Sequence, residues 1–320
     1  NVVTILFFVK IYQYLPLAKP RAITRMLNSV YKSNALSVLD LEDSSKDFMD
    51  LNITRSLKKE ARIALEFVMN FNYDSTDIQR FAIRINSPKT EFYKYDVLAL
   101  NKIINKNSVK SIWVPMVDSV DDLITISKDF SSFIDCGTKI VPIIETVDGL
   151  NNIDLILKHK YTFKFDGIHY GHYDYSLDAG EFPLLEQNDI LFLERVKRII
   201  GIIEGYGLNY IHTPIGRLKD RDLLLGVMDW LESNTSSDFG VTALNINQSK
   251  WYGLNSEEFN IMIKNSVDHD NDIEKATWIV DQFNDNKCSG RSFSVDKKRC
   301  FITPHEYMLA SNFLKTNNIG

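Results

Sequence analysis

Eight short apolar segments recur along the 320-residue chain, and helix-length stretches separate most of them. They are Val2–Val9, Ala35–Leu41, Arg80–Ile85, Ser111–Val117, Lys139–Ile144, Asp166–Tyr170, Leu208–His212 and Phe239–Ile246. Strands of a parallel sheet are buried on both faces, so they read as continuous apolar runs, and each needs a crossover helix before the next. The spacing therefore favours an α/β fold in which every strand is followed by a helix.

Charged or polar residues lie at the exits of several of these runs. They are Asp40-Leu41-Glu42-Asp43, Arg84-Ile85-Asn86, Glu145-Thr146, Asp174 and His212-Thr213. A carboxylate at the end of a buried strand is costly unless a metal, a cation or a substrate meets it. In a (β/α)8 TIM barrel the active site lies at the C-terminal ends of the strands. The pattern thus predicts such a barrel, with its chemistry at that rim.

An open, doubly wound α/β sheet is the structural alternative, and it normally has a glycine-rich turn after its first strand. The segment Lys10–Pro16, which we expect to be the turn after the first run, contains no glycine and favours the closed barrel. We predict a TIM-barrel domain over residues 1–250 and a C-terminal helical extension over residues 251–320. Helices are expected at Ser256–Ile279 and Pro304–Leu314, where the extension would cover the rim or a neighbouring subunit.

Composition excludes several other classes of protein. The formal net charge of -5, without a basic patch interleaved with aromatic residues, argues against nucleic-acid binding. The run Val2–Val9 is too short to span a bilayer and lacks the flanks of a signal peptide. The three cysteines, Cys136, Cys288 and Cys300, show no paired spacing, which fits a reducing compartment. We therefore expect a cytoplasmic protein that binds neither nucleic acid nor membranes.

Glu145 and Asp174 are the strongest candidates for a metal site. Each follows an apolar run, and the two runs are successive strands, so both carboxylates would meet at the mouth of the barrel. Oxygen ligands of this kind suit a hard divalent cation such as Mg²⁺. The alternative is that one carboxylate caps the next helix and the other pairs with an arginine.

Arg84 and its neighbours form a second candidate group. Side chains alternate along a strand, so Arg84 shares a face with Asn86, and its planar fork suits a carboxylate or enolate oxygen. A structural ion pair with Glu42 or Asp43 is the alternative. These two acids are adjacent, so we expect one inside the barrel and one at the rim.

Three histidines near the strand ends are weaker candidates. His169 and His172 are three positions apart, so they would face opposite sides of a strand and not share an ion. One of the two is still a candidate for substrate contact. His212 ends the seventh run and is a candidate for substrate contact and for acid–base catalysis. A histidine at such a place is more often simply hydrogen-bonded.

These motifs, in this order, resemble the citrate lyase beta subunit and HpcH/HpaI aldolase family. The matching segments are Leu39–Ser44 followed by Lys58–Arg62, Arg84-Ile85-Asn86, Val114-Pro115, Ile143–Thr146, Gly171–Asp174 and Asp178-Ala179-Gly180. The resemblance covers nearly the whole chain and extends to the Pro304–Leu314 helix.

The resemblance implies a TIM barrel that assembles as a homotrimer or hexamer. Glu145 and Asp174 would hold Mg²⁺, with Mn²⁺ as an alternative, and Arg84 would grip a substrate oxygen. Glu42 and Asp43 would order metal-bound water and Arg84. The implied activity cleaves or forms a carbon–carbon bond in an organic acid or its acyl-CoA thioester, through a metal-stabilised enolate.

Two departures from the family pattern bear on the substrate. Members that act on acyl-CoA usually have Pro-Lys-Val where this chain has Pro115-Met116-Val117. The family's His-Pro-x-Gln corresponds here to Asn245-Ile246-Asn247-Gln248. Both changes weaken the expectation of a CoA thioester. We expect a metal-dependent lyase or aldolase acting on a 2-oxo or hydroxy acid, with a thioester hydrolase or a non-catalytic ligand-binding barrel as the alternatives.

Overall fold

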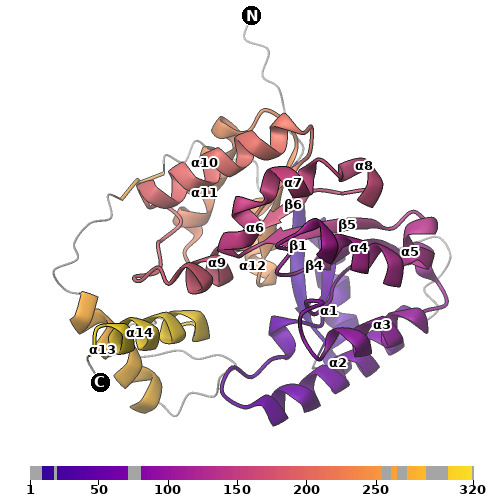
Figure 1. The fold of residues 1–320 in the computed structure, drawn as a ribbon, viewed down its shortest axis with the longest axis horizontal. Coiled ribbons are helices and arrows are strands. Elements are labelled where there is room, and N and C mark those ends of the chain that lie inside the picture. The colour runs from indigo at the N-terminus through magenta and orange to yellow at the C-terminus, as the bar shows by residue number, and fades with distance from the viewer. Residues whose placement is uncertain are drawn as a thin grey trace, which may run out of the picture.

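The computed structural model describes residues 9–17, 20–70, 81–253, 261–264, 272–285 and 302–318. Eight strands in this part of the chain form a closed barrel in which all neighbours are parallel (Figure 1). The strands are β1 (Val9–Pro16), β2 (Leu36–Asp40), β3 (Phe81–Arg84), β4 (Val109–Val114), β5 (Lys139–Ile144), β6 (Ile168–Tyr170), β7 (Tyr210–His212) and β8 (Phe239–Ala243). The predicted TIM barrel is confirmed.

Helices follow the strands around the outside of the barrel. They are α1 (Pro20–Lys32), α2 (Leu51–Asn70), α3 (Tyr93–Asn101), α4 (Val120–Asp129), α5 (Ser131–Asp135), α6 (Val147–Asn151), α7 (Ile153–Leu157), α8 (Lys160–Phe163), α9 (His172–Ala179), α10 (Ile190–Gly205), α11 (Arg221–Asn234), α12 (Ile246–Tyr252), α13 (Asp272–Asp285) and α14 (Pro304–Thr316). The domain boundary that we predicted at residue 250 falls inside α12.

The first strand lies later in the sequence than predicted. β1 occupies the segment that we expected to be a turn, and residues 2–8 of the predicted strand Val2–Val9 lie outside the described residues. Tyr12 and Tyr14 face one side of β1, whereas Ile11 and Leu15 face the other. This alternation of aromatic and aliphatic residues fits a strand with both faces buried, and the more apolar segment before it obscured the pattern.

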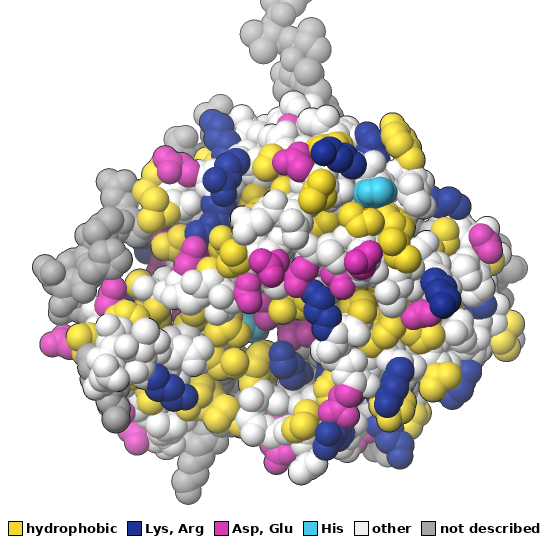
Figure 2. Space-filling view, viewed as in Figure 1, with side chains coloured by type: hydrophobic (Ala, Val, Ile, Leu, Met, Phe, Trp, Pro, Cys, Tyr) yellow, Lys and Arg dark blue, Asp and Glu magenta, His cyan; other side chains and the backbone are white. Residues whose placement is uncertain are grey.

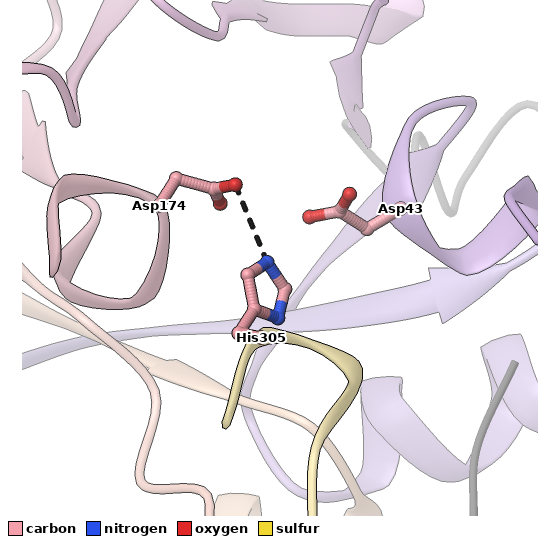
Figure 3. Close-up of side chains that lie close together, drawn as sticks. All are labelled: Asp43, Asp174 and His305. Carbon is pink, nitrogen blue, oxygen red and sulfur yellow. Dashed lines mark hydrogen bonds and ion pairs between the residues drawn. The ribbon is translucent and has the colours of Figure 1, made fainter. Parts of the chain in front are cut away.

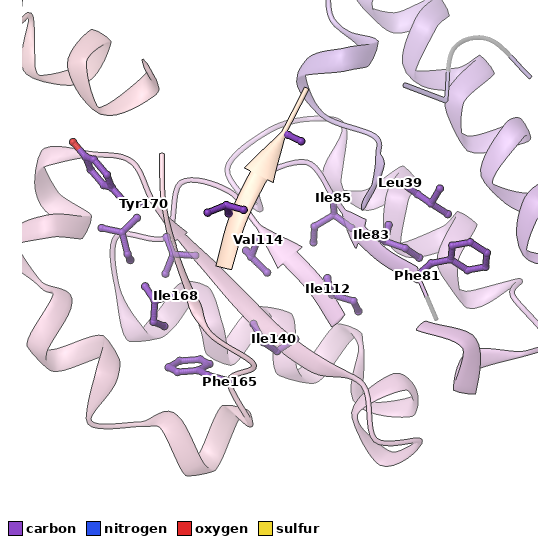
Figure 4. Close-up of a cluster of buried hydrophobic side chains, with 14 of the residues drawn as sticks. Leu39, Phe81, Ile83, Ile85, Ile112, Val114, Ile140, Phe165, Ile168 and Tyr170 are labelled. Carbon is purple, nitrogen blue, oxygen red and sulfur yellow. The ribbon is translucent and has the colours of Figure 1, made fainter. Parts of the chain in front are cut away.

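Two apolar layers lie on opposite faces of the strands. Tyr12 of β1 and Trp113 of β4 are in contact, with ring centroids 5.1 Å apart, although their strands are not neighbours. Only the barrel interior brings such strands together, so this cluster fills the interior. The larger cluster packs between strands and helices, and Figure 4 shows part of it, including Ile83, Ile112 and Ile140 on neighbouring strands.

Alternation along the strands also places the polar residues at the rim. Val38, Ala82 and Ile143 point into the interior. Two residues further along each strand, the same face carries Asp40, Arg84 and Glu145. Charged groups from three strands are thereby directed into the C-terminal mouth of the barrel.

The C-terminal extension forms a helical pair beside the barrel. α13 and α14 share an apolar cluster, and the rings of Phe283 and Tyr307 stack with centroids 3.8 Å apart. α14 also contacts α9 at the rim (Figure 1). The predicted final helix is confirmed. The helix predicted at Ser256–Ile279 is wrong in its described first part, because residues 261–264 are not helical and α13 begins at Asp272.

Candidate active site at the mouth of the barrel

Arg84 lies at the end of β3 and meets three carboxylates. Its Nε and Nη2 donate to the two oxygens of Asp40, each at 2.7 Å. Its Nη1 lies 3.1 Å from Glu42 Oε2 and 3.4 Å from Asp43 Oδ2. Both acids reach Arg84, contrary to the expectation that they face opposite ways, because the 3-10 turn η1 (Asp43–Ser45) reverses the chain. The guanidinium also lies 4.5 Å from the centre of the Tyr14 ring.

The environment drives the two adjacent acids toward different protonation states. Burial raises the pKa of Glu42 to about 8, Asp43 adds to this shift, and Arg84 opposes it. Burial acts in the same direction on Asp43, but Lys46 and Arg84 outweigh it and hold its pKa below the usual range. Glu42 therefore carries a proton near neutral pH while Asp43 is ionised.

One N–H group of Arg84 is available for a ligand. A guanidinium has five N–H groups in a planar fork. Asp40 takes one from Nε and one from Nη2, and the two on Nη1 face Glu42 and Asp43. The second N–H of Nη2 has no partner within the described part of the chain. This N–H is not used by any of the pairs described above.

Glu145 follows β5 and is 4% exposed. Its Oε1 accepts a hydrogen bond from the backbone N–H of Met116 at 2.8 Å. Burial, with further contributions from Asp174 and Glu42, raises the pKa of Glu145 well above its ordinary value. A side chain at Gly171 would collide with this carboxylate, which explains the glycine there. Among the described residues Glu145 forms no ion pair, so its ionised form lacks a direct cationic partner.

The segment after β4 differs from the family pattern in its side chain but takes part in the site through its backbone. Met116 has a φ of 55°, a left-handed conformation that is uncommon for a residue other than glycine, and this turns its N–H toward Glu145. The side chain of Lys89 donates to the carbonyl oxygen of Met116 at 3.0 Å and pairs with Asp118. A cation is therefore present near this strand exit, although it comes from the segment after β3.

Asp174 lies in the first turn of α9 and faces a histidine from the C-terminal extension. His305 Nε2 is 3.3 Å from Asp174 Oδ1, and one ligand atom from each of Asp43, Asp174 and His305 lies within 4.8 Å of the others. Figure 3 shows the His305 ring projecting from α14 toward the gap between the two carboxylates. Burial lowers the pKa of His305, but Asp174 and Asp43 outweigh it and raise the pKa.

The donor set fits a divalent cation. Carboxylate oxygens are ligands for Mg²⁺ and Mn²⁺, and an imidazole nitrogen suits Mn²⁺ and later transition metals. Asp43 Oδ1 is buried without a hydrogen-bond donor and has only the Lys46 ammonium, 3.5 Å away, as an ion-pair partner. Glu145 is not a member of this close group, but it interacts electrostatically with Asp174. The arrangement leaves negative charge that a cation would neutralise.

Asn86 belongs to a buried network below the rim. Its Nδ2 donates to Asp96 Oδ2 at 2.7 Å and to the Leu41 carbonyl oxygen at 3.0 Å. Its Oδ1 accepts from Lys58, which also donates to the carbonyl oxygens of Leu41 and Glu42. The network holds the segment after β2 in place. Asn86 is therefore placed to support Arg84 and its partners, and its predicted contact with substrate stays a prediction.

The structure does not bring the other candidate histidine into the site. His212 lies on the outer face of β7, because Ile211 points into the barrel. Its ring nitrogens bond Tyr210 at 2.9 Å and Gln187 at 3.0 Å, and its ring packs against Phe192. The predicted substrate contact of His212 has no support in this geometry and plays no part in the function proposed below.

His169 and His172 have separate partners. His169 lies close to the Tyr14 hydroxyl and the Ile211 carbonyl oxygen, at 3.3 and 3.1 Å. His172 Nε2 lies 2.9 Å from the Leu185 carbonyl oxygen. His172 opens α9 and does not lie on a strand, so the argument from strand alternation does not apply to it, and whether the two histidines share an ion stays a prediction.

Sequence reasoning missed Asp40 and His305 as site residues. Asp40 could have been found, because it shares the inward face of β2 with Val38 and lies level with Arg84 in the strand register. His305 is separated from Asp174 by 131 positions and lies on a helix with no apolar strand before it. No local signal marks it as part of the mouth.

The face that carries the mouth is rich in acidic side chains. Figure 2 shows Asp and Glu side chains gathered in the middle of this face, beside a hollow between the barrel and the C-terminal helices.

In the described ranges, no helix combines the length and the apolar character that crossing a membrane requires.

Comparison with known proteins finds one family model that matches the sequence. The family model described as HpcH/HpaI aldolase/citrate lyase matches residues 10–222. None of the proteins with curated functions matches the sequence significantly.

Solved structures share the fold at low sequence identity. RipC from Yersinia pestis has a TM-score of 0.54 at 19% identity, covering 78% of this chain and 96% of that chain. CitE from Mycobacterium tuberculosis in complex with magnesium and pyruvate has a TM-score of 0.58 at 16% identity, covering 82% and 93%. The CitE complex with magnesium, acetoacetate and coenzyme A has a TM-score of 0.58 at 14% identity, covering 97% and 98%. At such identities the likeness concerns the fold alone.

Proposed function

The chain belongs to the HpcH/HpaI aldolase/citrate lyase family, and from this we propose that it is a divalent-metal-dependent carbon–carbon lyase or aldolase of the citrate lyase beta type. Its substrate would be a small 2-oxo or hydroxy acid or the acyl thioester of one. Solved CitE relatives are complexes with magnesium and pyruvate or acetoacetate, and these ligands belong to the same chemical class.

One observation carries the proposal. Glu145 and Asp174 follow neighbouring strands at the mouth of the barrel, and neither forms an ion pair with a lysine or arginine among the described residues. Burial raises the pKa of Glu145 well above its ordinary value, and the negative charge of Asp174 adds to this shift, so a cation beside the two carboxylates would be stabilising. Two carboxylates arranged in this way favour a bound cation over a structural role, and Asp174 and Glu145 are the residues that we assign to hold it.

The roles of the side chains follow from their positions. A bound divalent cation would polarise the carbonyl of a 2-oxo acid and stabilise negative charge on the enolate fragment. Arg84 would orient a substrate oxygen through the second N–H of Nη2, and Asp40 holds the guanidinium in place. Glu42, with a pKa of about 8, is suited to give or take a proton near neutral pH. Asp43 keeps Glu42 and Arg84 in position.

Calorimetry with Mg²⁺ followed by pyruvate tests the metal assignment. We expect wild-type protein to bind the cation, and Glu145→Gln and Asp174→Asn to lose at least about tenfold in affinity. Asp148→Asn, which removes an exposed carboxylate in the first turn of α6, is the matched control and should bind as wild type. Unchanged affinity in both site variants would contradict the assignment.

Enolate chemistry can be measured without knowing the second substrate. We expect the protein with Mg²⁺ to exchange the methyl protons of pyruvate in D2O, as followed by NMR, and EDTA to stop the exchange. Release of a free acid from an acyl thioester without a carbonyl fragment would favour a hydrolase instead. Binding of pyruvate without exchange, together with no cleavage of any acid or thioester tested, would favour a ligand-binding barrel.

A further inference from the structure

His305 is the one histidine of the described chain that faces the carboxylates of the mouth. It lies in the first turn of α14, where Thr303 caps the helix and Glu306 completes the capping box. Its ring packs beside Phe48, with centroids 5.1 Å apart, and beside Tyr173, at 5.9 Å. The helix start and the two rings restrict where the imidazole can point.

Other histidines of the described chain are not placed to meet a cation there. His169 and His172 each have both ring nitrogens close to protein groups, and His212 lies outside the barrel. His159 is exposed on the helical exterior, before α8. Among the histidines that the structure describes, only His305 is placed to supply a nitrogen ligand for a cation at the mouth.

We propose that His305 is a ligand of the divalent cation, together with Asp43 and Asp174, so that the C-terminal extension supplies part of the metal site. The inference rests on the proposed function, which places a cation at Asp174. The three ligand atoms lie within 4.8 Å of one another, a spacing that one ion can bridge. Without a cation, Nε2–H of His305 donates to Asp174. With one bound, the unprotonated Nε2 of a neutral ring faces the ion.

A nitrogen ligand changes which metal the site prefers. Mg²⁺ is bound mainly by oxygen atoms and keeps several waters, whereas imidazole suits Mn²⁺, Co²⁺ and Zn²⁺ better. A site of two carboxylates and one imidazole therefore favours Mn²⁺ or Co²⁺ over Mg²⁺. The all-carboxylate pair Glu145 and Asp174 would not produce this preference. Metal selectivity thus reports the contribution of His305.

Pulsed electron paramagnetic resonance of the Mn²⁺-loaded protein detects a coordinated nitrogen directly. We expect ¹⁴N modulation from an imidazole in wild-type protein and its loss in His305→Gln. Mn²⁺ affinity in calorimetry should fall by about 10–100-fold in that variant, and Mg²⁺ affinity should change less. His159→Gln is the matched control and should keep the nitrogen signal. Circular dichroism and thermal unfolding confirm that each variant is folded, and His305→Asn provides a second replacement.

The outcomes separate this inference from the proposed function. Absence of ¹⁴N modulation in wild-type protein, or its persistence in His305→Gln and His305→Asn, would overturn the role of His305. If Asp174→Asn and Glu145→Gln still lost cation binding, the proposed function would stand. If both of those variants bound Mn²⁺ as wild type, the proposed function would fail first.

Discussion

The two sides of the barrel mouth differ in how their buried carboxylates are paired. On the β2–β3 side Asp40, Glu42 and Asp43 surround Arg84, so that acids and base are paired within the protein. On the β5–β6 side the described residues give Glu145 only a backbone N–H and Asp174 only a histidine. The two sides belong to the same rim and are held by the same parallel sheet.

This difference distinguishes a framework from a binding site. A buried ion pair with good geometry is satisfied without any ligand, and it fixes the side chains that form it. Glu145 lacks such a partner among the described residues, burial raises its pKa, and a carboxylate in this position gains most from an added cation. We infer that the β2–β3 side positions groups, whereas the β5–β6 side receives the ion.

Removing Arg84 should cause the largest loss of stability. Arg84→Met leaves Asp40 buried without its partner, and we expect the free energy of unfolding to fall by about 3–5 kcal/mol. Urea unfolding monitored by circular dichroism measures the change. Arg55→Met is the control, because Arg55 pairs with Glu91 on an exposed surface and such pairs contribute about 0–1 kcal/mol. Equal losses in the two variants would contradict a framework role for the buried Arg84–Asp40 pair.

The buried histidines of β6 and β7 should make the protein less stable in mild acid. Burial lowers the pKa values of His169 and His212 to about 3. Below about pH 6.5 the unfolded chain binds protons that the folded chain does not, so each histidine should cost about 2 kcal/mol of stability at pH 5. The loss continues as the pH falls toward the folded pKa.

Glu42 changes the stability in the opposite direction as the pH falls, so histidine variants are needed to separate the contribution of the histidines from that of Glu42. Its folded pKa of about 8 lies above the unfolded value, and its contribution to stability grows as the pH falls from 8 toward the unfolded pKa. The measurement is the change in unfolding free energy between pH 7.5 and pH 5 for wild type, His212→Gln and His159→Gln. We expect His212→Gln to reduce the acid-induced loss by about 2 kcal/mol, and exposed His159 to have no effect. A reduction of equal size in both variants would be inconsistent with a buried neutral His212.

Gly171→Ala tests how tightly Glu145 is held. The added Cβ would overlap the Glu145 carboxylate, and overpacking of this kind costs about 1–3 kcal/mol. Cation affinity should also fall, because the carboxylate must move. Gly201→Ala is the control, because no atom lies within 4 Å of its added Cβ inside α10, and alanine stabilises a helix there by about 0.5–1 kcal/mol. If Gly171→Ala stabilised the protein as Gly201→Ala does, the Glu145 carboxylate would not be held in its place.

The sequence was sufficient for the barrel and for placing Arg84 near Glu42 or Asp43 at its rim. Buried parallel strands carry a pattern that is local, and the residues that follow each strand necessarily meet at one rim. Arg84, Glu42 and Asp43 lie together for this reason. Asp40 follows from the same alternation, because it shares the inward face of β2 with Val38.

The contacts that depend on long-range packing could not be predicted in the same way. His305 reaches Asp174 only because α14 docks on α9, and the residues that dock it carry no motif. His212 was assigned to the mouth because it ends an apolar run. Side chains alternate along β7, and because Ile211 points into the barrel, His212 points outward. Which of the two residues faces inward depends on how β7 pairs with its neighbouring strands.

The smallest predicted effect concerns α14, which belongs to neither side of the mouth. Thr303→Ala removes a capping-box hydrogen bond at the helix start, and such a loss costs about 1 kcal/mol. Because α14 packs mainly on α13 and α9, we expect faster amide hydrogen exchange in α14 with little change in global unfolding. Ser119→Ala removes the equivalent cap of α4 on the barrel, and here the global free energy of unfolding should fall by a similar amount. If Thr303→Ala lowered global stability as much as Ser119→Ala, the extension would unfold together with the barrel. His305 would then be as firmly placed as the carboxylates of the β5–β6 side.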